Sequence, residues 1–272
     1  MNKSNEQYLY WLRSNSLFLK PLIQSIESVN LKHFQELNSD IFPDFEAKLR
    51  LGKKVERFFS FALKDHPRFK ILGENLQIIE NGITKGELDF IIEDLESAEV
   101  FHLEMVHKFY LHIPKKGQSA EDCLIGPNLK DSLNQKLRKL KKHQFPLIQD
   151  PFCMKTLRDR GLDAEMMSQK LLFTAEIFES KKQSMESDII NKNCVSGYWQ
   201  SLQTFKNSHH KGDLYHLPIK SEWLTNPDLC MDWTDTEEFW SGLEKEIKNR
   251  YSPMVWKKSD NKISKLFVVW WD

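Results

Sequence analysis

The sequence predicts an α/β protein in which a sheet of at least three strands is flanked by amphipathic helices. Residues 86–92 and 101–111 are apolar, strand-like runs, and the polar stretch 93–99 between them consists of turn-forming residues. Helical periodicity marks residues 44–65 and 128–143. Because 40% of the 272 residues are hydrophobic, the chain can bury a sizeable core.

Composition and charge narrow the class of protein. Lysine plus arginine and aspartate plus glutamate each total 39, so binding to nucleic acid requires a local basic patch. The four cysteines form no CxxC pair, which leaves no recognisable zinc ribbon. The sequence has no secretory signal and no run of about 18 apolar residues, so we expect a cytoplasmic protein without membrane segments.

Helices are expected before the strands. Residues 6–37 carry helix-like spacing, and Pro21 is expected to open a second helix within them. A longer amphipathic helix over residues 44–65 ends before Pro67 and carries Glu56 at the edge of its apolar stripe. The stripe consists of Leu51, Val55, Phe58, Phe59, Ala62 and Leu63.

Three strands should follow. Residues 69–72 and 76–79 predict an interrupted strand, and Asn81-Gly82 predicts the turn into the hairpin. Alternation along the last strand gives one face a set of mostly polar residues, His102, Glu104, Val106, Lys108 and Tyr110. On the facing strand, the same alternation directs Glu87 and Asp89 to the polar face. It directs Leu88, Phe90 and Ile92 to the core.

Asp89 and Glu104 lie equally far from the centre of the hairpin turn, so they should face each other across the ladder. Directly opposed residues have Cβ atoms about 4.5–5.5 Å apart, and like charges placed in this way repel unless a cation lies between them. A divalent metal would satisfy the pair. The alternative is a solvated sheet face on which these acids pair with lysines such as Lys85 and Lys108.

A basic helix is expected after the hairpin. The Gly126-Pro127-Asn128 corner should open a helix that runs to about His143 and stops at Pro146. Lys136 falls within its leucine stripe, and Gln144 projects the same way. The outer face carries the candidate nucleic-acid contacts Lys130, Arg138, Lys139 and Lys142. The alternatives are an ordinary solvated helix face and a Lys136 side chain that reaches past the leucines to water.

The C-terminal part has fewer motifs. The expected elements are a strand over 170–177, a helix or strand over 197–205, a strand over 214–219, an acidic helix over 235–250 and a final strand over 266–271.

Two carboxylates can hold Mg²⁺ or Mn²⁺ and leave coordination positions for water and a phosphodiester oxygen. Such an ion activates water and stabilises charge in the transition state, and a lysine can stabilise the same charge. Asp89 and Glu104, with Glu56 as a further acid, therefore point to hydrolysis of nucleic acid.

Several motifs occur together: Glu56 on a helix, Gly86-Glu87-Leu88-Asp89-Phe90, His102-Leu103-Glu104, Lys108-Phe109-Tyr110-Leu111, Gly126-Pro127-Asn128, Asp131, Lys136, His143-Gln144, Leu217-Pro218 and Glu222-Trp223-Leu224. This set resembles an uncharacterised bacterial family of the PD-(D/E)XK, restriction-endonuclease-like superfamily, most strongly over residues 50–145. The resemblance implies a central mixed β-sheet flanked by helices and a metal-dependent nuclease site. We accordingly expect a helical lead-in (1–40), a nuclease-like core (41–178) and an α+β C-terminal extension (179–272).

One position departs from the superfamily pattern. Glu-x-Lys is expected, but Val106 stands two residues after Glu104, and the next lysine on that face is Lys108. In a regular strand Lys108 lies about 13 Å along the chain from Glu104, against about 7 Å for the usual spacing. Three explanations remain open: a bulge returns Lys108 to the site, Lys136 replaces it from the helix, or the site has lost catalysis.

Two functional hypotheses follow. The first is a Mg²⁺-dependent nuclease that hydrolyses DNA, with RNA as the second choice. In it Asp89 and Glu104 bind metal, Glu56 assists, Lys108 or Lys136 stabilises charge, and Gln144 orients substrate or water. The second is an inactive nuclease-fold module that binds nucleic acid or a protein partner, and a purely structural scaffold is a third reading.

Overall fold

The computed structural model describes residues 3–34, 49–260 and 262–271, and these residues are organised around one large mixed β-sheet. Ten strands of the described residues belong to the sheet: β1 (Glu27–Ser28), β2 (Phe69–Glu80), β3 (Ile83–Asp94), β4 (Glu99–His112), β5 (Leu124–Ile125), β6 (Ser168–Ser180), β7 (Val195–Ser201), β8 (Leu214–His216), β9 (Met254–Ser259) and β10 (Lys262–Val269). The same residues form six α-helices: α1 (Lys3–Leu12), α2 (Leu51–Asp65), α3 (Leu133–Lys139), α4 (Pro151–Arg158), α5 (Leu202–Asn207) and α6 (Glu237–Lys248). The predicted α/β class with a mixed sheet is confirmed.

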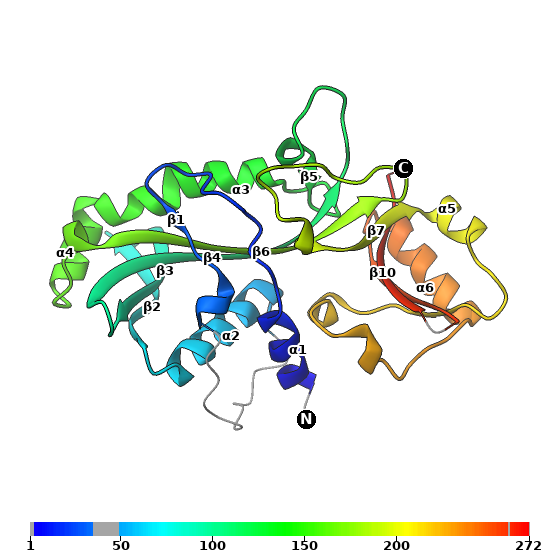
Figure 1. The fold of residues 1–272 in the computed structure, drawn as a ribbon, viewed down its shortest axis with the longest axis horizontal. Coiled ribbons are helices and arrows are strands. Elements are labelled where there is room, and N and C mark those ends of the chain that lie inside the picture. The colour runs from blue at the N-terminus through cyan, green and yellow to red at the C-terminus, as the bar shows by residue number, and fades with distance from the viewer. Residues whose placement is uncertain (1–2, 35–48, 261, 272) are drawn as a thin grey trace.

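The main path through the sheet is β2-β3-β4-β6-β7-β10-β9-β8, with β1 beside β6 and β5 beside β4. Pairing is antiparallel at both ends and parallel from β4 through β6 and β7 to β10. Because β4 and β6 are parallel, the chain between them crosses from one end of the sheet to the other. That connection carries α3 and α4 along one face, while α1 and α2 lie on the other (Figure 1).

The predicted hairpin forms in the predicted register. Phe90 pairs with Leu103, and the antiparallel ladder continues to Asp94 opposite Glu99. Pairing starts one residue beyond Asp89 and Glu104, so these two residues stand where the strands separate. The register was predictable from the position of the polar turn between the two apolar runs.

Strand β3 departs from the predicted alternation at Asp89. Phe90 and Ile92 pack with the α2 side of the core, whereas Leu88 packs with Leu147 on the opposite face. The expectation that Leu88, Phe90 and Ile92 share one face is therefore wrong. The neighbouring strand β2 changes face at the same level, where Asn75 has a φ of 50° and the register has already shifted after Ile71.

The predicted basic helix is present, but it begins later and is irregular. Helix α3 starts at Leu133, because the Ser132 hydroxyl accepts a hydrogen bond from Gln135 N and caps the first turn. Its last turn widens into a π-helical turn, η3 (Leu140–Gln144), in which the Phe145 amide donates to Leu140 O. A 3₁₀ segment, η4 (Phe145–Gln149), then leads into α4.

The N-terminal segment is less helical than predicted. No helix begins at Pro21 in the described residues; instead β1 joins the sheet, followed by a 3₁₀ turn, η1 (Leu31–Phe34). The backbone amides of Leu17 and Val29 donate to carbonyls of β6, so pairing with the sheet outweighs the local helical pattern. Predicted helical residues within 35–48 lie outside the described residues.

The C-terminal part extends the same sheet. Residues 197–205 form both predicted alternatives, since β7 ends at Ser201 and α5 follows. Strand β9 was not predicted, and it forms a hairpin with β10. Lys265 Nζ of β10 lies 2.5 Å from Glu176 Oε2 of β6 and 2.8 Å from Tyr10 Oη. This buried contact joins the lead-in, core and extension expected from the sequence.

A membrane-spanning helix would need to be long and apolar, and none of the helices described for this chain meets that condition.

Candidate active site

Asp89 and Glu104 are the centre of the candidate site. Glu104 is fully buried and Asp89 is 9% exposed. Where the ladder between β3 and β4 ends, Asp89 Oδ2 accepts a hydrogen bond from Met105 N at 3.0 Å, so a side chain takes the place of a strand carbonyl. Glu104 interacts with both the side chain and the backbone of Asp89. The two predicted acids therefore meet, and the solvated sheet face considered as an alternative is wrong.

Both oxygens of Glu104 accept hydrogen bonds. His102, on the same face of β4, places Nε2 at 3.0 Å from Glu104 Oε1. Gln144 Nε2, from the π-helical turn, donates to Glu104 Oε2. Gln169 of β6 lies opposite His102 in the parallel ladder, with its Nε2 at 3.2 Å from His102 Nδ1. The carboxylate is thus held from the sheet and from the helix.

Lys136 is the lysine beside the acids. Its Nζ donates to Gln144 Oε1 at 2.9 Å, and its charge lowers the pKa of Asp89 and Glu104 against the effect of burial. Lys108 instead pairs with Asp131 Oδ2 at 2.6 Å. The ladder between β4 and β6 has no register shift from Phe101 to Leu111, so no bulge brings Lys108 back toward Glu104. Of the three explanations for Val106, the bulge is absent.

Burial dominates the electrostatics of the site. Burial raises the pKa of Asp89 to about 7, and the charge of Glu104 adds to the rise. Burial likewise raises the pKa of Glu104 to about 7, against the opposing charge of Lys136. It lowers the pKa of Lys136, and it lowers the pKa of His102 to about 4. Burial opposes ionisation of both acids, and Lys136 is only partly buried beside them. A centre of this kind favours an added cation.

Glu56 lies at the periphery of this centre. Lys53 of the same helix bridges Glu56 Oε2 and Glu87 Oε1, each at 2.7 Å, and also donates to Asn75 Oδ1. Burial raises the pKa of Glu56, and the charge of Asp89 contributes in the same direction. Glu87 therefore points toward α2 and Lys53. The expected convergence of Glu87 with Glu104 does not occur.

The donor set fits a cation held by two carboxylates. In the part of the chain that the structure describes, no cluster of three or more His, Cys, Asp or Glu residues is arranged to hold a metal ion. Mg²⁺, however, is commonly bound through one or two carboxylates, with waters and substrate phosphates completing its octahedron. Asp89 and Glu104 meet this requirement, because their buried oxygens are close together and short of positive charge.

A family model described as a domain of unknown function (DUF1853) matches residues 10–269. The chain belongs to the DUF1853 family. No curated protein and no solved structure matches it. The match begins within α1, near its C-terminal end, and covers the carboxylate pair and all ten described strands, so the DUF1853 unit includes the whole described sheet.

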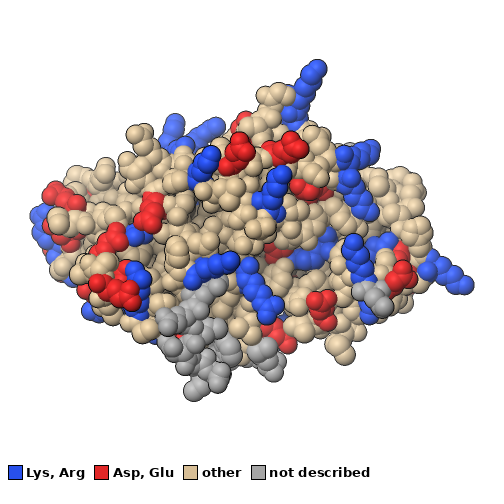
Figure 2. Space-filling view, in the orientation of Figure 1, with Lys and Arg blue, Asp and Glu red and all other residues tan. Residues whose placement is uncertain are grey.

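The outer face of the helical layer of this DUF1853 protein is basic. Figure 2 shows lysine and arginine side chains projecting from the upper edge of the molecule, above α3. Within the described residues no ion pair is found for the exposed cations of this face, which are Lys130, Arg138, Lys139, Lys141 and Lys142, then Lys155 and Arg158 of α4 and Arg160 just after it. The four predicted nucleic-acid contacts are thus available to a polyanion.

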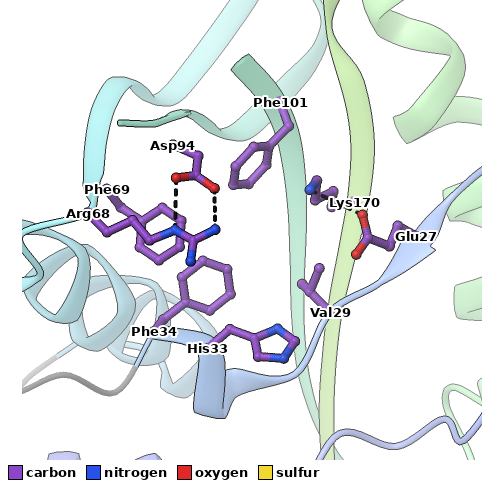
Figure 3. Close-up of a pocket in the computed structure, with 9 residues that line it drawn as sticks. All are labelled: Glu27, Val29, His33, Phe34, Arg68, Phe69, Asp94, Phe101 and Lys170. Carbon is purple, nitrogen blue, oxygen red and sulfur yellow. Dashed lines mark hydrogen bonds and ion pairs between the residues drawn. The ribbon is translucent and has the colours of Figure 1, made fainter. Parts of the chain in front are cut away.

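A separate pocket of about 350 Å³ lies on the opposite face, near η1 and the start of β6. Phe34, Phe69 and Phe101 line it, and Arg68 forms two hydrogen bonds with Asp94 at its edge (Figure 3). The lining includes neither member of the carboxylate pair, so the pocket is separate from the candidate site.

Two contributors to the site were missed from the sequence. Gln169 is an unremarkable polar residue at the start of a strand, and only the register of β6 against β4 places it beside His102. Lys53 lies one turn before Glu56, and an i,i+3 acid–base pair gives no sign that a third group, Glu87, joins it. Both omissions concern contacts between segments distant in sequence.

Stability should depend on pH through Asp89. Because the folded-state pKa is raised, the contribution of the protonated acid is present below the unfolded pKa near 4 and is lost as pH rises through about 7. The test compares the free energies of urea unfolding of Asp89→Asn and the unaltered protein in EDTA. The difference in favour of Asp89→Asn should be about 1–2 kcal/mol larger at pH 8 than at pH 5. An equal difference at both pH values would contradict the raised pKa.

Glu104→Gln should behave differently from Asp89→Asn. An amide retains one acceptor oxygen, whereas His102 and Gln144 donate to two, so one buried donor loses its partner. We expect a cost of about 1–3 kcal/mol at pH 5, where Asp89→Asn is nearly neutral. Comparison of the two urea midpoints tests this asymmetry, and similar midpoints would argue against the two-donor arrangement.

Proposed function

We propose that the chain is a divalent-metal-dependent nuclease that hydrolyses phosphodiester bonds in DNA, with Mg²⁺ or Mn²⁺ bound by Asp89 and Glu104. The observation that carries the proposal is the meeting of these two buried acids where β3 and β4 separate, with Lys136 beside them. A structural role alone gives no reason for two adjacent buried carboxyl groups, since burial of unpaired charge is costly.

The roles of the residues follow from their contacts. When bound, the ion would supply Lewis-acid stabilisation of negative charge on a phosphodiester oxygen. Lys136 would place a second positive charge near the same acids, and Gln144 orients both Lys136 and Glu104. Glu56 lies close enough to influence Asp89, but its carboxylate is bound to Lys53, so it is an outer acid of the site.

Lys136 is the better candidate for the lysine of the superfamily pattern. It reaches the acids from α3, whereas Lys108 is neutralised by Asp131. The restriction-endonuclease-like core over residues 41–178, the cytoplasmic location and the bacterial origin belong to the same proposal. The sequence resemblance supports the core and the bacterial origin, and the mixed sheet with acids on adjacent strands and a basic helix above supports the core.

The second candidate is an inactive module of the same fold that binds nucleic acid or a protein partner. Val106 favours it, because this residue is buried where a lysine is expected on the strand. The basic helical face could bind nucleic acid under either proposal. The two candidates differ in turnover, which can be measured directly.

Cleavage of supercoiled plasmid, linear duplex and single-stranded DNA should require Mg²⁺ or Mn²⁺ and stop in EDTA. Asp89→Asn and Glu104→Ala should abolish it, and Lys136→Met should lower the rate about 10²–10³-fold through loss of a stabilising charge. Lys108→Met is the matched control and should retain most activity, since Lys108 pairs with Asp131. Metal-dependent cleavage that survives both acid substitutions would refute the assignment, and binding without cleavage would select the inactive module.

The basic face should control binding separately from cleavage. In EDTA and with Asp89→Asn present, neutralising Lys130, Arg138, Lys141 and Lys142 should weaken duplex binding and reduce the slope of log K against log salt by about 0.9 per lost contact. Lys139 is retained because its charge reaches Glu104. The control replaces Lys182, Lys192, Lys211 and Lys248, which are also exposed. Equal salt slopes in the two variants, measured by fluorescence anisotropy, would remove this face from the proposal.

A further inference from the structure

His102 is buried beside Glu104 and Gln169 is partly buried next to it, yet neither has a part in the chemistry proposed above. The His102 side chain is fully buried, and its ring packs edge-on against Phe145 with centroids 6.1 Å apart. Gln169 reaches this ring from β6, while Glu104 lies two residues along β4. Three elements thus converge on one imidazole.

The orientation of the Gln169 amide is fixed by a neighbouring carbonyl. Gln169 Nε2 donates to Phe145 O at 2.9 Å, and a carbonyl oxygen can only accept, so the nitrogen and not the oxygen of the amide faces this side. The same Nε2 lies 3.2 Å from His102 Nδ1. Its second hydrogen therefore points to Nδ1, which must carry a free lone pair.

The tautomer of His102 follows from this geometry. A neutral imidazole with a free lone pair on Nδ1 carries its hydrogen on Nε2. That hydrogen faces Glu104 Oε1 at a donor–acceptor distance of 3.0 Å. His102 Nε2 consequently has no lone pair to offer a metal ion or a proton. In this tautomer the histidine is a donor to the acid and is neither a metal ligand nor a general base.

Glu104 is therefore oriented by two arms of different exposure. The inner arm runs from Gln169 through His102 to Oε1, and its two ionisable members, His102 and Glu104, have no exposed side-chain surface. The outer arm runs from Lys136 through Gln144 to Oε2, and both of its side chains are partly exposed. A ligand entering from solvent meets the outer arm, while the His102 side chain of the inner arm is fully buried.

We propose that Gln169 and His102 form a positioning relay, in which the amide fixes the histidine as an Nε2–H donor and the histidine fixes the Glu104 carboxylate for cation binding. The relay rests on the proposed function, because it assumes that Glu104 is a ligand. Gln169 acts only through His102, and neither residue touches the cation or the substrate.

The tautomer can be measured without any metal. Long-range ¹⁵N–¹H NMR of the metal-free protein should show His102 with its hydrogen on Nε2. In Gln169→Glu a carboxylate faces Nδ1 and accepts from it, so the signal should change to a form protonated at Nδ1. Nδ1–H in the unaltered protein would overturn the relay. Gln169→Leu, which adds no charge, provides a second variant in which the Nε2–H preference should weaken.

The positioning role is tested by Mn²⁺ titration calorimetry. His102→Leu should weaken Mn²⁺ affinity about 10–100-fold, as is typical when a partner that orients a metal ligand is removed. Gln169→Leu should weaken it about 10-fold alone and add nothing to His102→Leu, because it acts through the imidazole. His102→Gln, which restores a donor, should recover part of the loss. His107→Leu, on the opposite face of β4, is the control and should bind as the unaltered protein does.

The outcomes separate the relay from the function on which it rests. Unchanged Mn²⁺ affinity in His102→Leu, or additive losses in the double variant, would overturn the relay while the metal site stands. No Mn²⁺ binding by the unaltered protein would contradict the proposed function and the relay together. Circular dichroism of each variant confirms that a loss of affinity comes from a folded protein.

Discussion

The structure around β3 and β4 is organised by one electrostatic constraint: two carboxyl groups are buried next to each other. Water is the usual means of stabilising such groups, and here it is largely excluded from Asp89 and Glu104. Neighbouring groups replace part of this solvation. Met105 N, His102 and Gln144 donate hydrogen bonds to the acids, and Lys136 contributes a positive charge. Burial outweighs these contacts, so the pKa of both acids stays raised, and this agrees with the cation that the geometry of the pair suggests.

Backbone irregularities in three elements lie near this pair. Strand β2 changes face at Asn75 and strand β3 at Asp89, so the Asp89 carboxylate can reach the Met105 amide of the neighbouring strand. The π-helical turn directs Gln144 to the sheet on the other side. Regular strands and a regular helix would not bring these groups together, and irregularities of both kinds are frequent at functional sites.

The sequence was sufficient for the parts of the fold that depend on local pattern. Hairpin register followed from the turn and from alternation, and α2 followed from its apolar stripe. The pairing of Asp89 with Glu104 was within reach because both residues belong to one hairpin. Residues 13–30 were misread as helical, since their partner is β6, about 150 residues later in the chain, and propensity carries no information about such a contact. Gln169 was missed for the same reason, and the start of α3 was placed too early because Ser132, not the Gly126 corner, caps it.

The position of the groups around Glu104 depends on the number of residues in the π-helical turn from Leu140 to Gln144. One additional residue in a turn rotates everything that follows by about 100° relative to a regular helix. The Gln144 side chain and the Phe145 carbonyl, which reach Glu104 and Gln169, both follow directly from that rotation. Among related proteins we therefore expect the spacing between the helical lysine and this glutamine to be kept strictly, while the intervening residues vary freely. Family members that have lost the Asp89–Glu104 pair should therefore differ from those that keep it by insertions or deletions in this turn more often than by substitutions.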